Sequence, residues 1–176
     1  MHGVFWGRFD PPTKAHLKII HDICEKFTSV HLVIIDDPKK QSPISTAIRE
    51  QWILDCLDES IINKVKFYKQ CTDIKYTYVD IKKIAGDKLA VVCGDDAYAT
   101  WLENNIQESK LSYDMIYVVA RHEQFDNLSD NIIVAYLPSE YHAISSQQVK
   151  NAISHNQSIS NQIHTKILGD VVDSYS

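Results

Sequence analysis

The apolar residues of this chain fall into two patterns that alternate along its length. Short, bulky apolar runs are typical of buried parallel strands, and they occur at Gly3–Gly7, Val30–Ile35, Val65–Tyr68, Leu89–Cys93, Met115–Ala120 and Ile132–Leu137. Between these runs, apolar residues recur at helical spacing, over Thr13–Phe27, Ser45–Leu57, Tyr78–Ile84, Ala97–Asn105 and Ser145–Ser154. Strands that alternate with helices predict an α/β fold, a doubly wound parallel sheet with right-handed crossovers.

The length and the last part of the chain bear on its domain organisation. A chain of 176 residues is long enough to bury one full hydrophobic core. We find no internal repeat and no linker, so we predict a single domain over residues 1–176. Residues 155–176 are rich in Ser, Asn and Gln, which is typical of a mobile C-terminal segment. The apolar residues of this segment instead favour packing on the body; they are Ile163, Ile167, Leu168, Val171 and Val172.

Composition and charge narrow the function classes. The chain is 44% apolar and 23% charged, as is usual for a soluble globular protein. Its formal net charge of −5 gives no global basic field, so we expect no nucleic-acid partner. We find no signal peptide and no apolar stretch of the roughly 18 residues that a membrane span needs, so we expect a cytoplasmic protein without a membrane partner. The cysteines and histidines lack paired metal-site spacing, so we predict no protein-held metal.

The turn after the first strand carries the first candidate chemistry. Ligands of open parallel sheets bind beyond the carboxyl ends of the strands, so the turns that follow Gly7 and Gly94 are expected to border a site. Thr13 and His16 are three residues apart and share one face of a first helical turn. The free N–H groups and the dipole of a helix N-terminus attract anions. Taken alone, the two side chains either donate to phosphate or serve as a helix cap and a partly buried histidine.

A second candidate anion site lies at the start of the last predicted helix. Ser146 and Lys150 are four residues apart, so a hydroxyl and a cation share one helix face close to its N-terminus. The alternative is an ordinary serine cap followed by a solvated lysine. Both candidate sites are expected to attract phosphate groups.

The two segments together resemble the signatures of one superfamily. Gly7–Ile20 (GRFDPPTKAHLKII) is similar to the nucleotidyltransferases with a [HT]xGH motif, with Ala15 in place of the usual glycine. Ile144–Lys150 (ISSQQVK) resembles their ISSTxxR box, which binds the ATP triphosphate. Here Gln147 replaces the usual threonine and Lys150 the usual arginine. The resemblance implies a Rossmann-like nucleotidyltransferase domain.

The middle of the chain resembles the nicotinate and nicotinamide mononucleotide adenylyltransferases. The similar segments are Ser45–Glu50, Tyr76–Thr77, Val92–Asp96 with the following Trp101, and Tyr117–Arg121. The resemblance implies transfer of AMP from ATP to the phosphate of nicotinate or nicotinamide mononucleotide. The products would be a dinucleotide and pyrophosphate, a step of NAD biosynthesis. Mg²⁺ would enter with ATP, because such ions bind mainly through phosphates and water.

The same resemblance assigns roles to individual residues. His16 would stabilise the α- and β-phosphates in the transition state, Thr13 would donate beside it, and Lys150 would hold the β- and γ-phosphates. The implied ATP-binding residues are Gly7, Arg8, Phe9, Thr13, His16, Gly94, Asp96, Ser145, Ser146 and Lys150. The implied acceptor-binding residues are Lys40, Arg49, Tyr76, Thr77, Asp95, Trp101 and Arg121. Catalysis would rest on positioning and charge stabilisation, because the acceptor phosphate is already an anion.

Several alternatives stay open at the level of sequence. The acceptor could be phosphopantetheine, as in pantetheine-phosphate adenylyltransferases, or the enzyme could be a cytidylyltransferase. The departures at Ala15, Gln147 and Lys150 leave room for a non-catalytic nucleotide-binding regulatory module. Asp95 and Asp96 could be helix caps, and Arg49 and Arg121 surface residues. The expected partners are ATP and a small phosphorylated acceptor, while a homo-oligomer and the choice between nicotinate and nicotinamide stay undecided.

Overall fold

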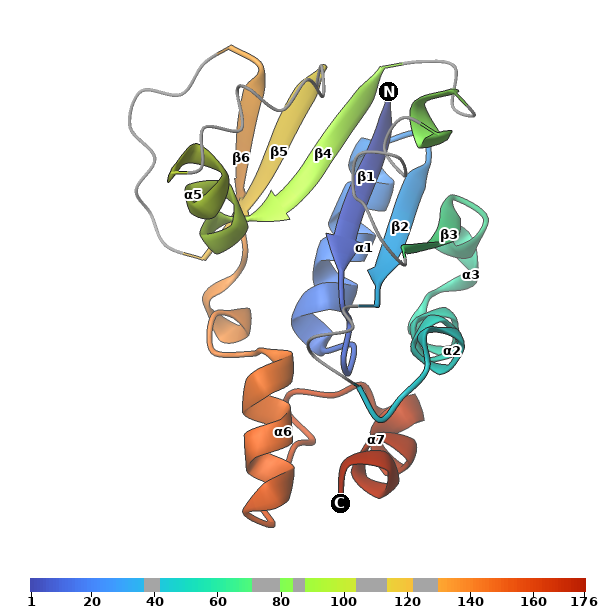
Figure 1. Cartoon of the computed structure of the whole chain (residues 1–176), viewed down its shortest axis with the longest axis vertical. Coiled ribbons are helices and arrows are strands. Elements are labelled where there is room, and N and C mark those ends of the chain that lie inside the picture. The colour runs from blue at the N-terminus through green and yellow to red at the C-terminus, as the bar shows by residue number, and fades with distance from the viewer. Residues whose placement is uncertain (37–41, 71–79, 84–87, 104–113, 122–129) are drawn as a thin grey trace.

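The computed structural model describes residues 1–36, 42–70, 80–83, 88–103, 114–121 and 130–176. Its strands are β1 (His2–Gly7), β2 (Val30–Ile35), β3 (Val65–Gln70), β4 (Leu89–Gly94), β5 (Met115–Ala120) and β6 (Ile132–Tyr136). They form one parallel six-stranded sheet in the order β3-β2-β1-β4-β5-β6 (Figure 1). The order reverses between β1 and β4, as in a doubly wound fold, so the predicted fold class is confirmed.

The helices begin and end close to where the apolar spacing places them. They are α1 (Lys14–Lys26), α2 (Thr46–Cys56), α3 (Glu59–Ile62), α5 (Asp95–Glu103), α6 (Ser146–Ser154) and α7 (Leu168–Tyr175), with 3-10 turns at Ser139–Tyr141 and Thr165–Ile167. Of the helix expected at Tyr78–Ile84, residues 80–83 are described and are helical. The prediction missed α3 and α7 and started α5 two residues late. Asp95 and Asp96 form the first turn of α5, where their carboxylates accept the main-chain N–H of the next residue and complement the positive end of the helix dipole.

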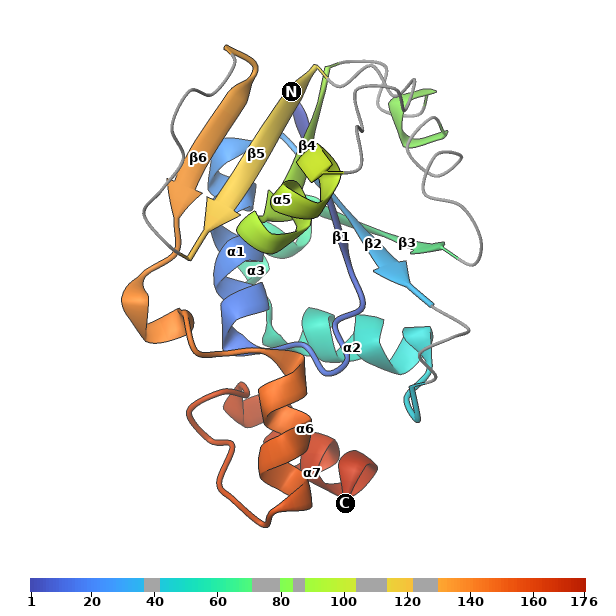
Figure 2. The same cartoon turned by 60° about the vertical axis from the view of Figure 1, so that its left-hand side comes forward.

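Helices cover the two faces of the sheet. Residues that alternate along the strands point to opposite faces, so Phe5 and Leu32 pack with α1 while Val4 and Val33 pack against Ile81. Farther along the second face, Tyr98 of α5 packs with β4 and β5. Figure 2 shows α5 in front of the sheet and α1 behind it. None of the helices in the described part of the chain has the length and apolar content that a membrane crossing requires.

The C-terminal segment packs against α2 at the carboxyl end of the sheet. Trp52 of α2 is buried in a cluster with residues of α6 and of the segment that follows it. The buried members from that segment are Ile159, Ile163, Ile167 and Val171. The apolar pattern of residues 155–176 therefore corresponds to packing, and it brings α7 beside the edge of the sheet at which a ligand is expected (Figure 1).

Candidate active site

The turn between β1 and α1 forms the first wall of the site. β1 ends at Gly7, where a Cβ atom would lie 2.7 Å from the ring of Phe9. Phe9 has a φ of 48° and is 1% exposed. Its ring packs edge-on against Phe5 and His16, with centroid separations of 5.5 and 5.2 Å. The turn therefore uses a buried aromatic ring to hold the imidazole of His16.

Thr13 and His16 form a reciprocal cap at the start of α1. The hydroxyl of the buried Thr13 accepts the main-chain N–H of His16, while the main-chain N–H of Thr13 donates to Nδ1 of His16 at 3.1 Å. A ring nitrogen that accepts from an N–H carries no proton, so the neutral imidazole has its proton on Nε2. The helix cap and phosphate binding, which the sequence presented as alternatives, are therefore compatible. The cap uses Nδ1 of His16 and leaves the Nε2 proton available to a phosphate.

The protonation state of His16 follows from its surroundings. Burial, together with the positive charge of Arg121, lowers its pKa from 6.5 to about 4. The imidazole is therefore neutral at pH 7. It can donate from Nε2 to a phosphate oxygen without carrying a charge of its own.

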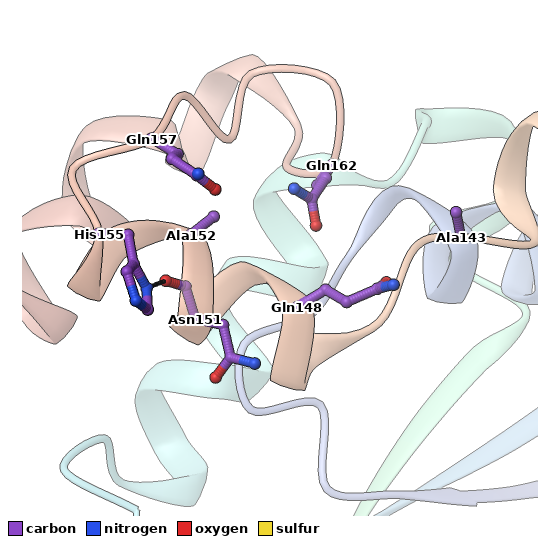
Figure 3. Close-up of a pocket in the computed structure, with 7 residues that line it drawn as sticks. All are labelled: Ala143, Gln148, Asn151, Ala152, His155, Gln157 and Gln162. Carbon is purple, nitrogen blue, oxygen red and sulfur yellow. Dashed lines mark hydrogen bonds between the residues drawn. The ribbon is translucent and has the colours of Figure 1, made fainter.

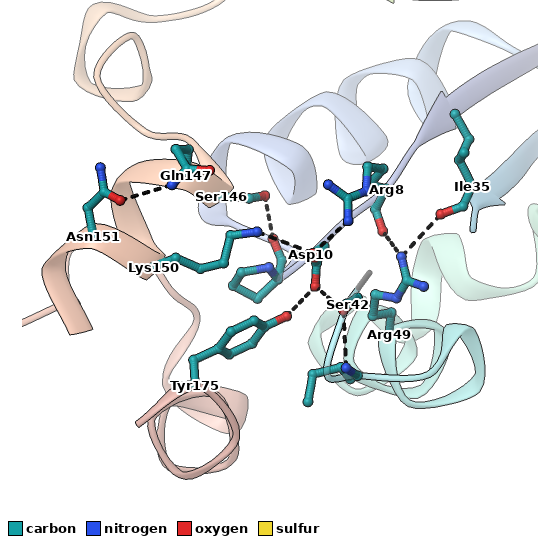
Figure 4. Close-up of polar contacts among 12 residues, drawn as sticks. Arg8, Asp10, Ile35, Ser42, Arg49, Ser146, Gln147, Lys150, Asn151 and Tyr175 are labelled. Carbon is teal, nitrogen blue, oxygen red and sulfur yellow. Dashed lines mark hydrogen bonds and ion pairs between the residues drawn. The ribbon is translucent and has the colours of Figure 1, made fainter. Parts of the chain in front are cut away.

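A buried carboxylate organises the second wall (Figure 4). Asp10 is 2% exposed, and its Oδ2 accepts from Arg8 and from Lys150, each at 3.2 Å. Its Oδ1 accepts the hydroxyl protons of Ser42 and Tyr175. Burial raises the pKa of Asp10, but the bonds from Ser42 and Tyr175 and the charge of Lys150 outweigh this, so that the pKa lies below its ordinary value.

Sequence reasoning missed Asp10, Ser42 and Tyr175. Asp10 lies inside the segment that resembles the [HT]xGH signature, and an acidic residue in a phosphate-binding turn is a signal that could have marked it. Ser42 and Tyr175 gave no such signal, because their contacts join segments far apart in the chain. We call the five residues Arg8, Asp10, Ser42, Lys150 and Tyr175 the Asp10 network.

The start of α6 lies against the turn that precedes α1. Ser145 caps α6 by accepting the main-chain N–H of Gln148, and the Ser146 hydroxyl donates to the carbonyl of Pro11 at 2.8 Å. Lys150 follows one turn later on the same face and reaches Asp10. Two helix N-termini and two cations therefore gather in one place, where an anion of several charges would be favoured.

Arg49 joins the ends of the first two strands instead of facing solvent. Its side chain is 1% exposed, and Nη1 donates to the carbonyls of Arg8 at 2.7 Å and Ile35 at 3.2 Å. A weaker contact joins Nη2 to Asp36 at 3.4 Å. The alternative of Arg49 as a surface residue is therefore wrong, because the open carboxyl ends of β1 and β2 need donors for their carbonyls.

Asp95 connects the ends of β4 and β5. Its Oδ2 accepts the main-chain N–H of Arg121 at 2.9 Å, which holds Arg121 at the same edge as His16. Gly94 precedes it, and a Cβ there would lie 2.7 Å from the Asp96 carboxylate. The structure thus gathers the ATP-side residues of the sequence prediction around the β1 and β4 ends.

Part of the predicted acceptor set is not among the residues that the structure describes. Lys40, Tyr76 and Thr77 lie outside the described residues. Trp101 belongs to α5, but its side chain is not among the described parts of the chain.

A group of possible metal ligands lies on the part of α1 away from the site. Among the described residues, the ligand atoms of His21, Asp22 and Glu25 are close enough to share a metal ion.

A separate hollow of about 440 Å³ lies beside α6 (Figure 3). Gln148, Asn151 and His155 line it from the helix face opposite to Ser146 and Lys150. The rest of the lining is Ala143, Ala152, Gln157 and Gln162. Because the lining is made of amides, an imidazole and small apolar groups without a lysine or an arginine, it suits a triphosphate less well than the Asp10 network does.

Comparisons with known proteins bear on the family and the fold of the chain. The family model of the cytidylyltransferase-like proteins matches residues 4–152. The fold resembles a Plasmodium falciparum nicotinic acid mononucleotide adenylyltransferase complexed with NaAD, at 16% identity, a TM-score of 0.80 and coverage of 99% of this chain and 95% of that one. The same enzyme complexed with APC gives 15% identity, a TM-score of 0.78 and coverage of 99% and 94%.

A putative nicotinate-nucleotide adenylyltransferase from Vibrio parahaemolyticus is similar at 14% identity, with a TM-score of 0.65 and coverage of 99% and 96%. A search of curated protein sequences finds no match. At identities this low, the structural similarity establishes the fold alone. The family model covers most of the chain, including the His16 turn, the Asp95 turn and the start of α6. By that match, which confirms the resemblance to nucleotidyltransferases, the chain belongs to the cytidylyltransferase-like family.

Proposed function

We propose that this protein transfers AMP from ATP to the phosphate of nicotinate or nicotinamide mononucleotide, forming a dinucleotide and pyrophosphate. The observation that carries the proposal is the neutral His16, whose Nε2 proton is set by the Thr13 cap. It stands at a helix N-terminus close to a second helix N-terminus with Lys150. The folds of adenylyltransferases complexed with NaAD and APC support the choice of substrates.

The reaction needs alignment more than proton transfer. The acceptor phosphate is an anion at neutral pH and attacks the α-phosphorus of ATP without a general base. Charge builds up on the phosphate oxygens and on the departing pyrophosphate, so preorganised donors lower the barrier. His16 donates from Nε2 to the α- and β-phosphates, and Thr13 orients it through Nδ1. Donation from the Thr13 hydroxyl directly to a phosphate stays a prediction.

The start of α6 holds the rest of the triphosphate. Lys150 and Arg8 supply positive charge, while Ser145, Ser146 and the N-terminal N–H groups of α6 supply donors. The backbone of Gly7 and Phe9 and the turn at Gly94 and Asp96 complete the ATP side of the site. These contacts neutralise pyrophosphate as it leaves.

The acceptor is expected on the β4 and β5 side. Arg121 is held there by Asp95, and its charge suits a phosphate or a carboxylate. The resemblance to mononucleotide adenylyltransferases adds Lys40, Tyr76, Thr77 and Trp101 to the proposed acceptor contacts. Arg49 contributes by fixing the ends of β1 and β2, which makes it a positioning residue.

The donor set fits a magnesium ion carried by ATP. Both oxygens of Asp10 already accept two donors each, so this carboxylate has no acceptor position left for a metal. Mg²⁺ bound to the triphosphate would supply further neutralisation of charge. Arg8 and Lys150 would then add to the neutralisation of the triphosphate charge, and they would not compete with Mg²⁺ for Asp10, because the ion binds through the phosphates.

Pyrophosphate release tests the proposal. We would supply ATP and Mg²⁺ with nicotinate mononucleotide, nicotinamide mononucleotide, phosphopantetheine or no acceptor, and repeat the panel with CTP. Release from ATP with one pyridine mononucleotide is the expected result. Release only with phosphopantetheine, or only from CTP, would replace the proposed substrates. ATP binding without release under any condition would favour a regulatory module.

A further inference from the structure

The C-terminal helix reaches the Asp10 network through its last aromatic residue. The hydroxyl of Tyr175 donates to Oδ1 of Asp10 (Figure 4), although the two residues come from opposite ends of the chain. Tyr175 is half-buried, and α7 is held in place by Val171 and Ile167 in the cluster around Trp52. The contact is therefore anchored by packing.

The four donors divide between the two oxygens of Asp10. Oδ2 faces the cations Arg8 and Lys150, which the proposed function assigns to the triphosphate. Oδ1 faces the hydroxyls of Ser42 and Tyr175. The two hydroxyls thus fix the orientation of the carboxylate through Oδ1, the oxygen that does not contact the cations. Without them, a buried carboxylate would lose half of its hydrogen bonds and would be free to rotate away from the cations.

We infer that Tyr175 is a positioning residue of the ATP site, which acts through Asp10 to keep Lys150 and Arg8 in place for the triphosphate. The inference deepens the proposed function and rests on it. By this inference α7 contributes to ATP binding, because the hydroxyl that completes the Asp10 network comes from the last turn of α7. A role in packing alone would need only the ring.

The test compares Tyr175→Phe with wild type, since phenylalanine keeps the ring and removes the hydroxyl. We expect the KM for ATP to rise about three- to tenfold, less than the direct loss of a hydrogen bond to a charged group would cause, because Tyr175 acts on the triphosphate only through Asp10. The KM for the acceptor should stay unchanged. Tyr141→Phe is the matched control, because Tyr141 is also half-buried and lies outside the Asp10 network. Ser42→Ala should act in the same direction as Tyr175→Phe, because it removes the second donor to Oδ1.

The pH profile separates this role from a structural one. The charged or titratable groups that face Asp10 are Arg8 on its own turn, Lys150 on α6 and Tyr175 on α7, with Arg49 of α2 near Tyr175. The Tyr175 bond lowers the pKa of Asp10. Its removal should therefore move the acidic limb of kcat/KM for ATP to higher pH, and the titration of Asp10 followed by carbon NMR should move the same way.

Each outcome decides between this inference and the proposed function. An unchanged KM for ATP and an unchanged Asp10 titration in Tyr175→Phe would overturn the inference while wild-type turnover leaves the proposed function standing. Equal rises in KM for ATP and for the acceptor would also overturn it. A wild-type protein that neither binds ATP nor releases pyrophosphate would overturn the proposed function. The assignment of Tyr175 to ATP would then fall with it, whatever the Asp10 titration shows.

Discussion

The imidazole of His16 takes its chemical role from the contacts of its Nδ1 with Thr13. Because Thr13 N–H occupies Nδ1, the proton on Nε2 is fixed, and burial keeps the ring neutral. His16→Ala should lower kcat about 100- to 1000-fold, as expected for the loss of one donor to a transition state. Circular dichroism and the melting temperature should change little by comparison. His155→Ala, at an exposed position of the α6 end, should keep wild-type kcat, whereas near-normal turnover of folded His16→Ala would refute the role.

Gly7 is sensitive for a steric reason. Its Cβ position is 2.7 Å from the Phe9 ring, and that ring packs on His16. Gly7→Ala should displace Phe9 and misalign His16, so we expect kcat to fall at least about tenfold. Gly169→Ala is the control, because no atom lies within 4 Å of the Cβ position there. Equal kcat values for both variants in the pyrophosphate assay would show that the Phe9 contact does not position His16.

At the scale of secondary structure elements, most of the fold could be predicted from periodicity. The strands are continuous apolar runs because helices cover both faces of the sheet, and this signal is local. The start of α5 was harder to place, since its first turn consists of the polar residues Asp95 and Asp96, which add nothing to the apolar spacing. The Asp10 network could not be predicted, because its donors come from four separate segments whose proximity exists only after folding.

The position of Lys150 near the start of α6 leads to a prediction about the affinity for ATP. Lys150 is the cation that α6 directs to Asp10, and loss of a charged hydrogen-bond donor to phosphate is worth about 10- to 100-fold in affinity. Lys150→Ala should therefore raise the KM for ATP by about that factor and change kcat less. Lys166→Ala, an exposed lysine, is the control. If Lys150→Ala shifts only the melting temperature, then Lys150 serves the fold and not the triphosphate.

At the scale of the whole molecule, the two ends of the chain meet where the strand order reverses. The β1 turn and the β4 turn border that point, as open parallel sheets predict. The structure adds α6 and α7, which fold back along α2 and bring Lys150 and Tyr175 to the same edge. The apolar residues of the C-terminal segment indicate that it packs on the body, but they do not indicate which surface it contacts, because that depends on matching apolar residues elsewhere in the chain.

A second buried imidazole lies away from the site and bears on the stability of the whole molecule. His31 of β2 is fully buried, 3.2 Å from the Ser29 hydroxyl and 3.1 Å from the Tyr68 hydroxyl. Burial, together with the charges of Lys66 and His2, lowers its pKa from 6.5 to about 4. His31 and His16 thus both stay neutral in the folded protein at pH values where an unfolded chain would protonate them.

These two histidines contribute to the loss of stability of the fold in acid. Between pH values of about 6.5 and 4, the unfolded chain binds protons that the folded chain does not, so the free energy of unfolding must fall as the pH falls through this range. His31→Gln should reduce the slope of unfolding free energy against pH by up to about one proton, measured by urea denaturation at several pH values. His155→Gln, at an exposed position, should leave the slope unchanged. A slope in His31→Gln equal to that of wild type would mean that His31 is protonated in the folded state, and its contact with Tyr68 would then have to be a donor bond that survives in acid.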